Sequence, residues 1–416
     1  MRILLVNKFY DPRGGTERVL FDLEDGLRER GHTLGVFACA HPSNRETPSR
    51  AVFLPERDYE NPGPLERLRH AAGTVYDVGA KRAFEHMLDD FEPDVVHLHN
   101  IYHQISPSIL DVLRARQVPT VLTLHDYKLV CPVYRLFRDG ALCEECVGTE
   151  WPLAAGFHGC SRGSAAESWL LALESTVHRL RRTYERAVTA YVSPSRFLAD
   201  VVRRQGISHQ RLHVIRNAPR NRPEVAGPEA RDPRPTVLFA GRVSPEKGVR
   251  VLVEAARRVP GVDVRIAGTG PEEAELKQES RDLANVHWLG HLDQASLEVE
   301  RARAWVVAVP SVWYENAPLS VIEAFAAGRP VLAADHGGLV EMVEDRVSGW
   351  RLAPGDVGAW AAAFERLPQA QSELMLMGTR ARAVADRDHD HQRFLDAHEA
   401  LYDALAPSVA TKEGPA

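Results

Sequence analysis

The sequence lacks three features that mark other classes of protein: many cysteines, a surplus of positive charge and a long apolar run. It holds only 5 cysteines among 416 residues, its formal net charge is −6, and it has no long uninterrupted apolar run. Few cysteines argue against a disulfide-stapled secreted domain, a negative charge argues against a nucleic-acid binder, and short apolar runs argue against a membrane-spanning chain. The apolar segment Ile3–Val6 is too short for a signal peptide, so we expect a cytosolic protein.

The composition is that of an ordinary globular protein, 44% hydrophobic and 26% charged, and the length suits about two domains. The first residues show the pattern of one of them. Ile3–Asn7 is a short apolar run, Val19–Leu27 repeats apolar residues at helical spacing, and Leu34–Ala38 is apolar again. A strand, a helix and a second strand in this order predict an α/β fold with a parallel sheet.

A polar, proline-rich segment at residues 217–235, reading NAPRNRPEVAGPEARDPRP, divides the chain. We interpret it as a linker between two doubly wound, Rossmann-like domains that face a central cleft. The first comprises residues 1–216 together with about 392–410, and the second comprises residues 236–391. Further strands are expected at Asp94–Leu98, Pro119–His125, Ala190–Ser193, Thr236–Ala240, Val262–Ala267, Val286–Leu289, Trp305–Val309 and Val331–Ala334, and helices at Ile105–Ala115, Glu167–Arg186, Gly248–Val259 and Gln392–Leu405.

The segment from Val309 to Gly349 carries the strongest chemical signal. A strand ends at Val309, a loop carries Glu315, a helix begins near Pro318, and Glu323 lies inside that helix. The free N–H groups and partial positive charge of a helix N-terminus favour a phosphate. Because carboxylates flank this helix end and bind hydroxyl groups, the segment predicts a cradle for a sugar, a diphosphate and a ribose.

This segment resembles the glutamate–seven residues–glutamate signature of retaining glycosyltransferase family 4, whose members have the GT-B fold. The downstream stretches GRPVLAADHGGLVEMV and SGWRLAPGD are similar to that family as well. The resemblance covers nearly the whole chain and is more specific in its C-terminal half. It implies an acceptor-side first lobe, a donor-binding second lobe, a last helix that crosses back to the first lobe, and sugar transfer with retention that needs no cofactor.

The same resemblance assigns roles to individual residues. Arg242 and Lys247, in GRVSPEKG, are expected to grip the donor diphosphate, where cations stabilise the charge that grows on the leaving group. Glu315 is expected to contact the donor sugar and Glu323 the ribose. Remaining contacts to the donor are expected from the glycine loop and from backbone groups at Gly14, Gly15, Gly268, Gly270, Ala317, Leu319 and Ser320.

Two strand ends on the acceptor side add histidines to the expected site. His125, in VLTLHDY, ends a strand at the edge where active sites of doubly wound sheets form. We expect it to hydrogen-bond a sugar hydroxyl rather than to act as a strong base. His99 and Asn100, in DVVHLHN, are expected to line the acceptor side. The family implies that the departing phosphate oxygen deprotonates the acceptor.

Four cysteines, Cys131, Cys143, Cys146 and Cys160, fall in one short stretch of the first domain. The Cys143-x-x-Cys146 pair has the spacing of a zinc knuckle, and in a reducing compartment clustered cysteines favour metal over disulfides. We therefore consider a structural, non-catalytic zinc, with a loop of reduced thiols as the alternative.

Residues 168–186 combine apolar residues with four arginines, a composition that suits a helix lying on an anionic membrane. The plainer interpretation is a helix with its apolar face on the core. Peripheral contact with the inner face of the membrane is thus an open alternative.

The expected partners are a UDP-, GDP- or ADP-sugar and an acceptor that the sequence does not identify. Two further functions stay open. Another GT-B-like enzyme, such as a phosphorylase or a nucleotide-sugar epimerase, would have the same fold. A non-catalytic nucleotide-sugar-binding scaffold would have no need of an intact set of Arg242, Lys247, Glu315 and Glu323.

Overall fold

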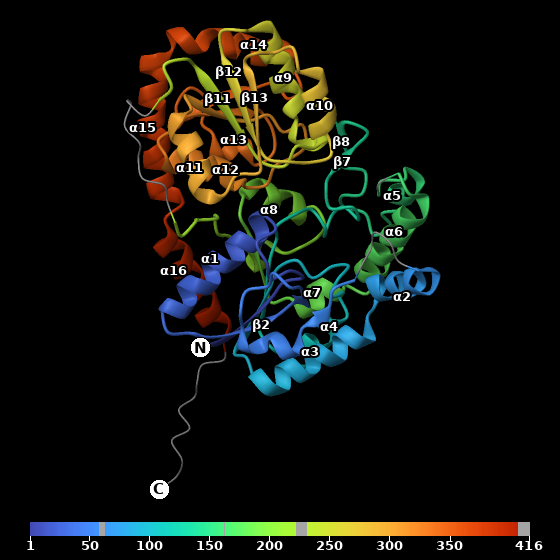
Figure 1. Ribbon diagram of the computed structural model, residues 1–416. Helices are drawn as coiled ribbons and strands as arrows, with labels where there is room; N and C mark the ends of the chain where they lie inside the picture. Colours follow the sequence, from blue (N-terminus) through green and yellow to red (C-terminus); the bar gives the residue numbers. More distant parts are fainter. Residues whose placement is uncertain (58–62, 162, 222–230, 407–416) are drawn as a thin grey trace.

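The computed structural model describes residues 1–57, 63–161, 163–221 and 231–406, which form two lobes (Figure 1). Each lobe contains one six-stranded parallel sheet, and residues from both lobes line a cleft between them. The GT-B architecture expected from the sequence is therefore confirmed. None of the helices in these ranges is long and apolar enough to cross a membrane.

The N-terminal lobe has the strand order β10-β9-β6-β5-β1-β2, with helices on both faces. Apolar residues fill the strands, so that β5, β6 and β9 are buried throughout. The strands are β1 Arg2–Val6, β2 Thr33–Phe37, β5 Val95–Leu98, β6 Thr120–Thr123, β9 Ala190–Ser193 and β10 Leu212–Val214, with short pairs β3 Cys39–Ala40 with β4 Leu54–Pro55, and β7 Phe137–Arg138 with β8 Ala141–Leu142. The helices are α1 Gly15–Glu29, α2 Pro64–Val75, α3 Val78–Phe91, α4 Ile109–Arg116, α5 Ala154–Phe157, α6 Ala165–Leu180, α7 Thr183–Ala187 and α8 Arg196–Arg203, with 3-10 turns at Pro48–Val52 and His209–Arg211.

The C-terminal lobe repeats the plan with the order β13-β12-β11-β14-β15-β16. Its strands are β11 Thr236–Ala240, β12 Asp263–Ala267, β13 Val286–Gly290, β14 Val306–Val309, β15 Val331–Ala334 and β16 Gly349–Leu352. Its helices are α9 Val249–Arg258, α10 Glu273–Glu279, α11 Gln294–Arg303, α12 Leu319–Ala326, α13 Leu339–Met342, α14 Val357–Arg366 and α15 Gln371–Asp388, with 3-10 turns at Pro245–Lys247 and Leu367–Gln369.

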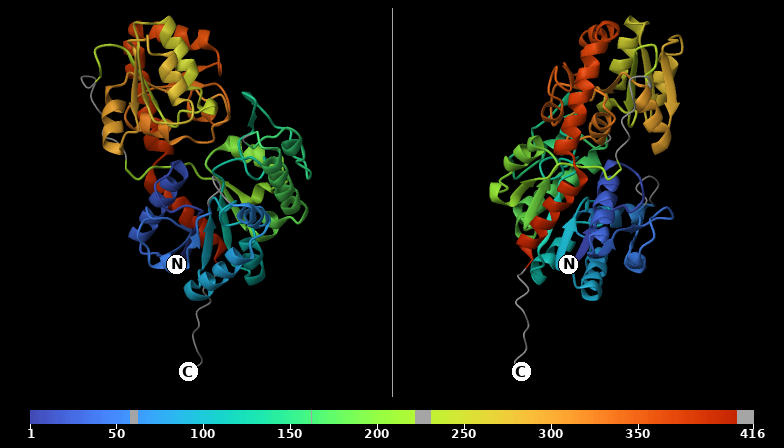
Figure 2. Two further views of the ribbon diagram at one scale, coloured as in Figure 1. Left: turned by 45° about the vertical axis from the view of Figure 1, so that its right-hand side comes forward. Right: turned by 90° about the vertical axis from the view of Figure 1, so that its left-hand side faces the viewer.

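The last helix, α16 His391–Leu405, leaves the C-terminal lobe and packs on the N-terminal one, as Figure 2 shows. Its buried face contributes Phe394, Leu395 and Tyr402 to the core beneath α1. The Tyr402 hydroxyl lies 2.6 Å from His97 Nδ1 on β5. The crossing predicted for this helix is thus confirmed.

Several expectations about local structure need correction. The single helix expected over 167–186 breaks at Arg182, whose φ of 50° ends α6 and starts α7. Strands β10 and β16 were not expected because they are short, with three and four residues. The predicted linker lies between β10 and β11, and its residues 222–230 are outside the described residues.

Candidate functional site

The N-termini of α1 and α12 face each other across the cleft. A Cβ added to Gly15 would lie 3.8 Å from Leu319 Cδ1, so the two first turns nearly touch. Gly14 is the N-cap residue of α1, with an extended φ of −171°, and a Cβ added there would make only an ordinary contact with Glu17 Oε2 at 3.6 Å. Both helix ends direct free N–H groups, including those of Leu319 and Ser320, toward the same space. This arrangement suits a diphosphate.

Glu315 is a buried carboxylate with three donors on one oxygen. Its Oε1 accepts from Lys247 Nζ at 2.7 Å, from Ser311 Oγ at 2.5 Å and from Trp313 Nε1 at 3.0 Å. Burial opposes its ionisation, but the Lys247 ammonium and these hydrogen bonds outweigh burial and hold the pKa of Glu315 below its usual value. Within the described residues Oε2 has no hydrogen-bond partner, so it is available to a hydroxyl group.

Glu323 is held from both lobes. Arg301, only 1% exposed, donates from Nη2 to Glu323 Oε2 at 2.6 Å. Arg18, on α1 of the other lobe, forms an ion pair with Oε1. Both carboxylate oxygens therefore have charged partners, and a ribose diol would have to share or replace the contact with Arg18, whose side chain is the more exposed of the two.

The loop after β11 carries the second predicted cation. Arg242 is exposed in the cleft and has no ion pair among the described residues. Gly268 and Gly270 pack against this loop: a Cβ added to Gly268 would lie 1.8 Å from Gly241 O, and one added to Gly270 would lie 2.1 Å from Val243 O. These glycines are required for the close approach of two backbones, and their contact with a nucleobase stays a prediction.

His125 and His99 form a hydrogen-bonded, stacked pair. His99 Nδ1 lies 2.8 Å from His125 Nε2, and the ring centroids are 5.1 Å apart. Burial lowers the pKa of His125 to about 3, so the ring is neutral at physiological pH and suits hydrogen bonding better than base catalysis. His99 is only 1% exposed and Asn100 only 7%, so both are buried at the end of β5, and their expected place on the acceptor side stays a prediction.

Direct contacts between the lobes lie beside the site. Asn316, next to Glu315, donates to Leu124 O at 3.2 Å, and its Oδ1 accepts from Ser195 Oγ at 2.5 Å. Tyr127 donates to Tyr314 O at 3.1 Å. These bonds fix the Glu315 loop against the strand end that carries His125. Ala317, in the same loop, is half-buried and accepts from Asn217 at 3.3 Å.

The four clustered cysteines are free thiols in the insertion between β6 and α6. Burial, and the neighbouring thiols of Cys131 and Cys143, raise the pKa of Cys160. Among the described residues, however, no group of three or more His, Cys, Asp or Glu side chains is arranged to hold a metal ion. Zinc binding stays a prediction, which metal analysis of the purified protein would test.

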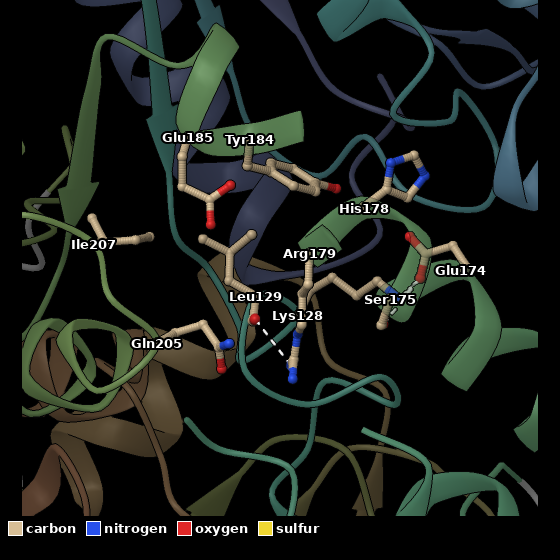
Figure 3. A pocket seen from close by; sticks show the side chains of 10 residues that line it. All are labelled: Lys128, Leu129, Glu174, Ser175, His178, Arg179, Tyr184, Glu185, Gln205 and Ile207. Atoms are coloured by element: carbon tan, nitrogen blue, oxygen red, sulfur yellow. Dashed lines mark hydrogen bonds and ion pairs between the residues drawn. The ribbon is translucent and has the colours of Figure 1, made fainter. Parts of the chain in front are cut away.

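A small cavity lies inside the N-terminal lobe near α6 and α7 (Figure 3). Its volume of about 30 Å³ is room for water but not for a sugar. Beside it Lys128 Nζ donates to Glu174 at 2.6 Å, and Arg179 donates to Leu129 O at 3.2 Å. These buried contacts hold α6 against the loop that follows His125. The cavity therefore lies in the part of the lobe that supports the cleft wall.

Sequence reasoning missed the side chains that hold the predicted carboxylates. Arg18 and Arg301 on Glu323, and Ser311 and Trp313 on Glu315, had no motif of their own. Trp313 lies two residues before Glu315, and this spacing could have predicted their contact. A buried indole N–H needs an acceptor, and Glu315 is the nearest carboxylate along the chain.

Two Rossmann-like lobes that face each other across a cleft, with a helix N-terminus on either side of it, define the class of the protein by its GT-B fold. Residues 13–218 match the family model described as Glycosyltransferase Family 4, and residues 222–384 match the one described as Glycosyl transferases group 1. The two matches together span most of the chain, which belongs to glycosyltransferase family 4.

Individual relatives agree with this membership. A glycogen synthase of Mycobacterium tuberculosis is 26% identical, over 97% of this chain and 94% of its own. Among solved structures, sucrose-phosphate synthase from Thermosynechococcus elongatus has a TM-score of 0.73 at 20% identity, covering 97% of this chain and 98% of that one. Anabaena HepE in complex with UDP and glucose has a TM-score of 0.68 at 19% identity, covering 97% and 100%.

The buried histidines around His125 give the first prediction. Burial lowers the pKa of His398 to about 4, and burial with neighbouring histidines lowers the pKa values of His97 and His99 well below 6.5. The unfolded chain binds these protons near pH 6.5 and the folded protein does not, so their stability contribution is present above pH 6.5 and is lost as pH falls toward the folded values. Each histidine adds up to about 1.4 kcal/mol per pH unit.

We therefore expect the free energy of unfolding in urea to fall steeply between pH 6.5 and pH 5. His398→Leu removes one of these groups and should reduce that slope by about 1.4 kcal/mol per pH unit, whatever its effect on stability at pH 8. An unchanged slope in the variant would contradict the neutral state of His398.

Proposed function

We propose that this protein is a retaining glycosyltransferase that moves a hexose-type sugar from a nucleotide diphosphate sugar to a glycan, a lipid-linked or a small-molecule acceptor. The observation that carries the proposal is the paired helix N-termini of α1 and α12 with Lys247 bonded to Glu315 beside them. Neighbouring structures include complexes with UDP, UDP-glucose and ADP, which supports a donor of this class.

In this proposal the donor diphosphate lies between the two helix ends, with Lys247 and Arg242 as its cations. The free Oε2 of Glu315 accepts a hydrogen bond from the sugar, and neutral His125 binds another hydroxyl from the opposite lobe. As the bond between sugar and phosphate breaks, negative charge grows on the leaving diphosphate, and the cations and helix ends stabilise it.

Retention follows in this proposal from attack on the face that the leaving group occupied. The acceptor oxygen bonds to the sugar carbon while its proton passes to the departing phosphate oxygen, so no side chain has to act as nucleophile. Two features support this. Glu315, the carboxylate beside the sugar, has one oxygen fully occupied by donors, and His125 is too weak a base to take the proton.

For a lipid-linked acceptor, the proposal includes peripheral contact of the protein with the membrane surface. Trp169 and Leu173 on α6 are 41% and 55% exposed, and Phe157 of α5, 74% exposed, packs edge-on against Trp169 at 4.8 Å. The plainer interpretation, a helix with its apolar face on the core, agrees with the burial of Leu171 and Ala172, whereas Trp169 and Leu173 lie outside that face.

A thermal-shift screen tests the donor class. A ligand at 100 times its Kd stabilises the folded state by about 2.7 kcal/mol, so UDP, GDP or ADP should raise Tm by several degrees at that concentration. The matching nucleotide sugar should then support transfer to an acceptor. Absence of any shift with all three nucleotides and their sugars would contradict the proposal.

The alternatives give different results in the same experiments. A phosphorylase would carry a lysine-bound pyridoxal phosphate that absorbs in the visible range. An epimerase would release nucleotide in the absence of any acceptor. A scaffold would bind nucleotide without turnover.

A further inference from the structure

A hollow of about 880 Å³ opens in the cleft next to the proposed donor site. Its C-terminal wall is the loop that carries Arg242, together with Pro271 and Trp313. Its N-terminal wall combines Lys8 and the β7–β8 hairpin with part of α6, and Figure 1 shows this hairpin reaching toward the C-terminal lobe. The hollow therefore shares one wall with the donor site and takes the rest from the acceptor lobe.

Lys8 is a half-buried cation in this wall without a counter-ion. Within the described residues its Nζ forms no hydrogen bond or ion pair, and its closest recorded contacts are the ring faces of Phe9 and Tyr102, 5.3 and 5.5 Å from the ring centroids. Two acids act on it from farther away, and both already have partners: Asp126 accepts from the Tyr102 hydroxyl at 2.8 Å, and Glu17 accepts from Asn7 Nδ2 at 3.2 Å. A partly buried ammonium group without a partner is costly unless a ligand supplies one.

Arg135, two residues before β7, and Arg138, in β7, add two arginines with unused donors. Arg135 donates from Nη2 to Cys160 O at 3.2 Å, but its buried Nε has no partner. Arg138 donates from Nη2 to Glu145 at 3.2 Å, and its buried Nη1 has none. Glu145 binds Arg138 through Oε1, while its Oε2 lies 2.8 Å from His158 Nε2, so it leaves Nη1 of Arg138 without an acceptor.

Among the described residues, Lys8 and Arg135 form no ion pair with an acid, whereas Arg138 is paired with Glu145 and Asp139. Asp139 is 88% exposed and lies 3.5 Å from Arg138. Glu167 accepts from Ser161 at 3.2 Å at the start of α6. Glu246 is half-buried on the opposite lobe, and no ion pair joins it to another described residue. Guanidinium N–H groups without acceptors, in a wall partly shielded from water, favour the binding of an oxyanion. The oxygens of a phosphate or carboxylate match the fork geometry of a guanidinium group.

The donor diphosphate does not explain the positive charge of the acceptor-lobe wall. Its diphosphate has Arg242 and Lys247 on the C-terminal lobe, whereas Lys8, Arg135 and Arg138 all belong to the acceptor lobe. The remaining wall is rich in aromatic rings, Phe9, Tyr134 and Trp313, whose faces suit sugar rings. We propose that the acceptor is a sugar that carries an oxyanion, a phosphate or a carboxylate, bound by Lys8, Arg135 and Arg138. This inference rests on the proposed function.

The test uses the full chain saturated with the nucleotide that the thermal-shift screen selects. Calorimetry then compares neutral hexoses with their 6-phosphates and their uronic acids, for glucose, galactose and mannose. We expect at least one anionic sugar to bind ten-fold or more tightly than its neutral parent. Preference for the phosphates alone, for the uronates alone, or for both identifies the oxyanion and supports the inference.

Two variants locate the effect. Lys8→Gln and Arg135→Gln should each reduce the preference for the anionic sugar at least five-fold while the Kd of the nucleotide stays within two-fold. Arg203→Gln makes the same change at an exposed arginine outside the hollow, paired with Asp200, and should change neither value.

Equal binding of every anionic sugar and its neutral parent to the nucleotide-saturated protein would overturn the inference, as would a preference that survives in both variants. Failure of the chain to bind any nucleotide would instead overturn the proposed function. The two failures are therefore distinguishable.

Discussion

Replacing Lys247 with alanine lowers the rate of sugar transfer about 100- to 1,000-fold, the cost of removing one preorganised charge donor from a developing anion. Lys247 Nζ lies 2.7 Å from Glu315 Oε1 and 5.1 Å from the centre of the Trp313 ring, so its position is fixed before the donor arrives. Without it, the leaving diphosphate loses a cation and Glu315 loses its main counter-charge. Steady-state kcat with saturating donor measures the effect.

Lys277→Ala is the matched control for Lys247→Ala. Lys277 also forms a carboxylate pair, with Glu273 at 2.7 Å, but it lies on the exposed surface of α10. The control should keep its activity within about two-fold, since exposed pairs contribute 0–1 kcal/mol. A Lys247→Ala enzyme that folds normally and retains more than a tenth of the wild-type kcat would contradict the role of Lys247.

Replacing Glu323 with alanine lowers the free energy of unfolding by about 3–5 kcal/mol, because it leaves the buried guanidinium of Arg301 without its counter-charge. Arg301 is 1% exposed and already has one unpartnered nitrogen, Nη1. Arg18 contributes less because its side chain is 29% exposed. Chemical denaturation measures the loss. If Glu323 binds the ribose, the donor KM should also rise about 10- to 100-fold, the value of a hydrogen bond to a charged group.

A double variant separates these two effects. Arg301→Met with Glu323→Leu replaces the buried pair by apolar side chains of similar size, which should recover most of the stability. The donor KM should stay high in that protein, because the carboxylate is still absent. Glu275→Ala is the surface control: Glu275 is 61% exposed and bonded to Arg250 at 2.6 Å, and its loss should cost under about 1 kcal/mol. A double variant with normal donor KM would contradict the ribose contact.

Local patterns predicted most of the fold. Strands at Ala190–Ser193, Thr236–Ala240 and Val331–Ala334 have the predicted bounds, because short apolar runs between turn signals are a property of neighbouring residues. The helix that follows Glu315 begins after Pro318, as expected, since proline suits a helix start. The pattern did not reveal the break at Arg182, where a left-handed φ of 50° in a non-glycine residue depends on packing between α6 and α7.

One stretch shows how packing overrides composition. Residues 386–391, reading DRDHDH, predict a solvated segment. In the structure His389 and His391 are 4% and 9% exposed, and their Nδ1 atoms lie 2.8 and 3.0 Å from Asn217 O and Ala218 O. The join between α15 and α16 is therefore tied to the segment after β10, a contact that no local pattern specifies.

The sequence by itself determined the two parallel sheets and the helix end between Glu315 and Glu323, because each depends on residues a few positions apart, whereas Arg242 and Lys247 were expected there only from the family resemblance. Only the tertiary structure decided which groups neutralise the carboxylates: Arg18 meets Glu323 across 305 positions of chain, and the buried Arg301 meets its other oxygen at 2.6 Å. Such pairings follow from the docking of the two lobes and from the free energy of burying charge, which neither periodicity nor motif spacing contains.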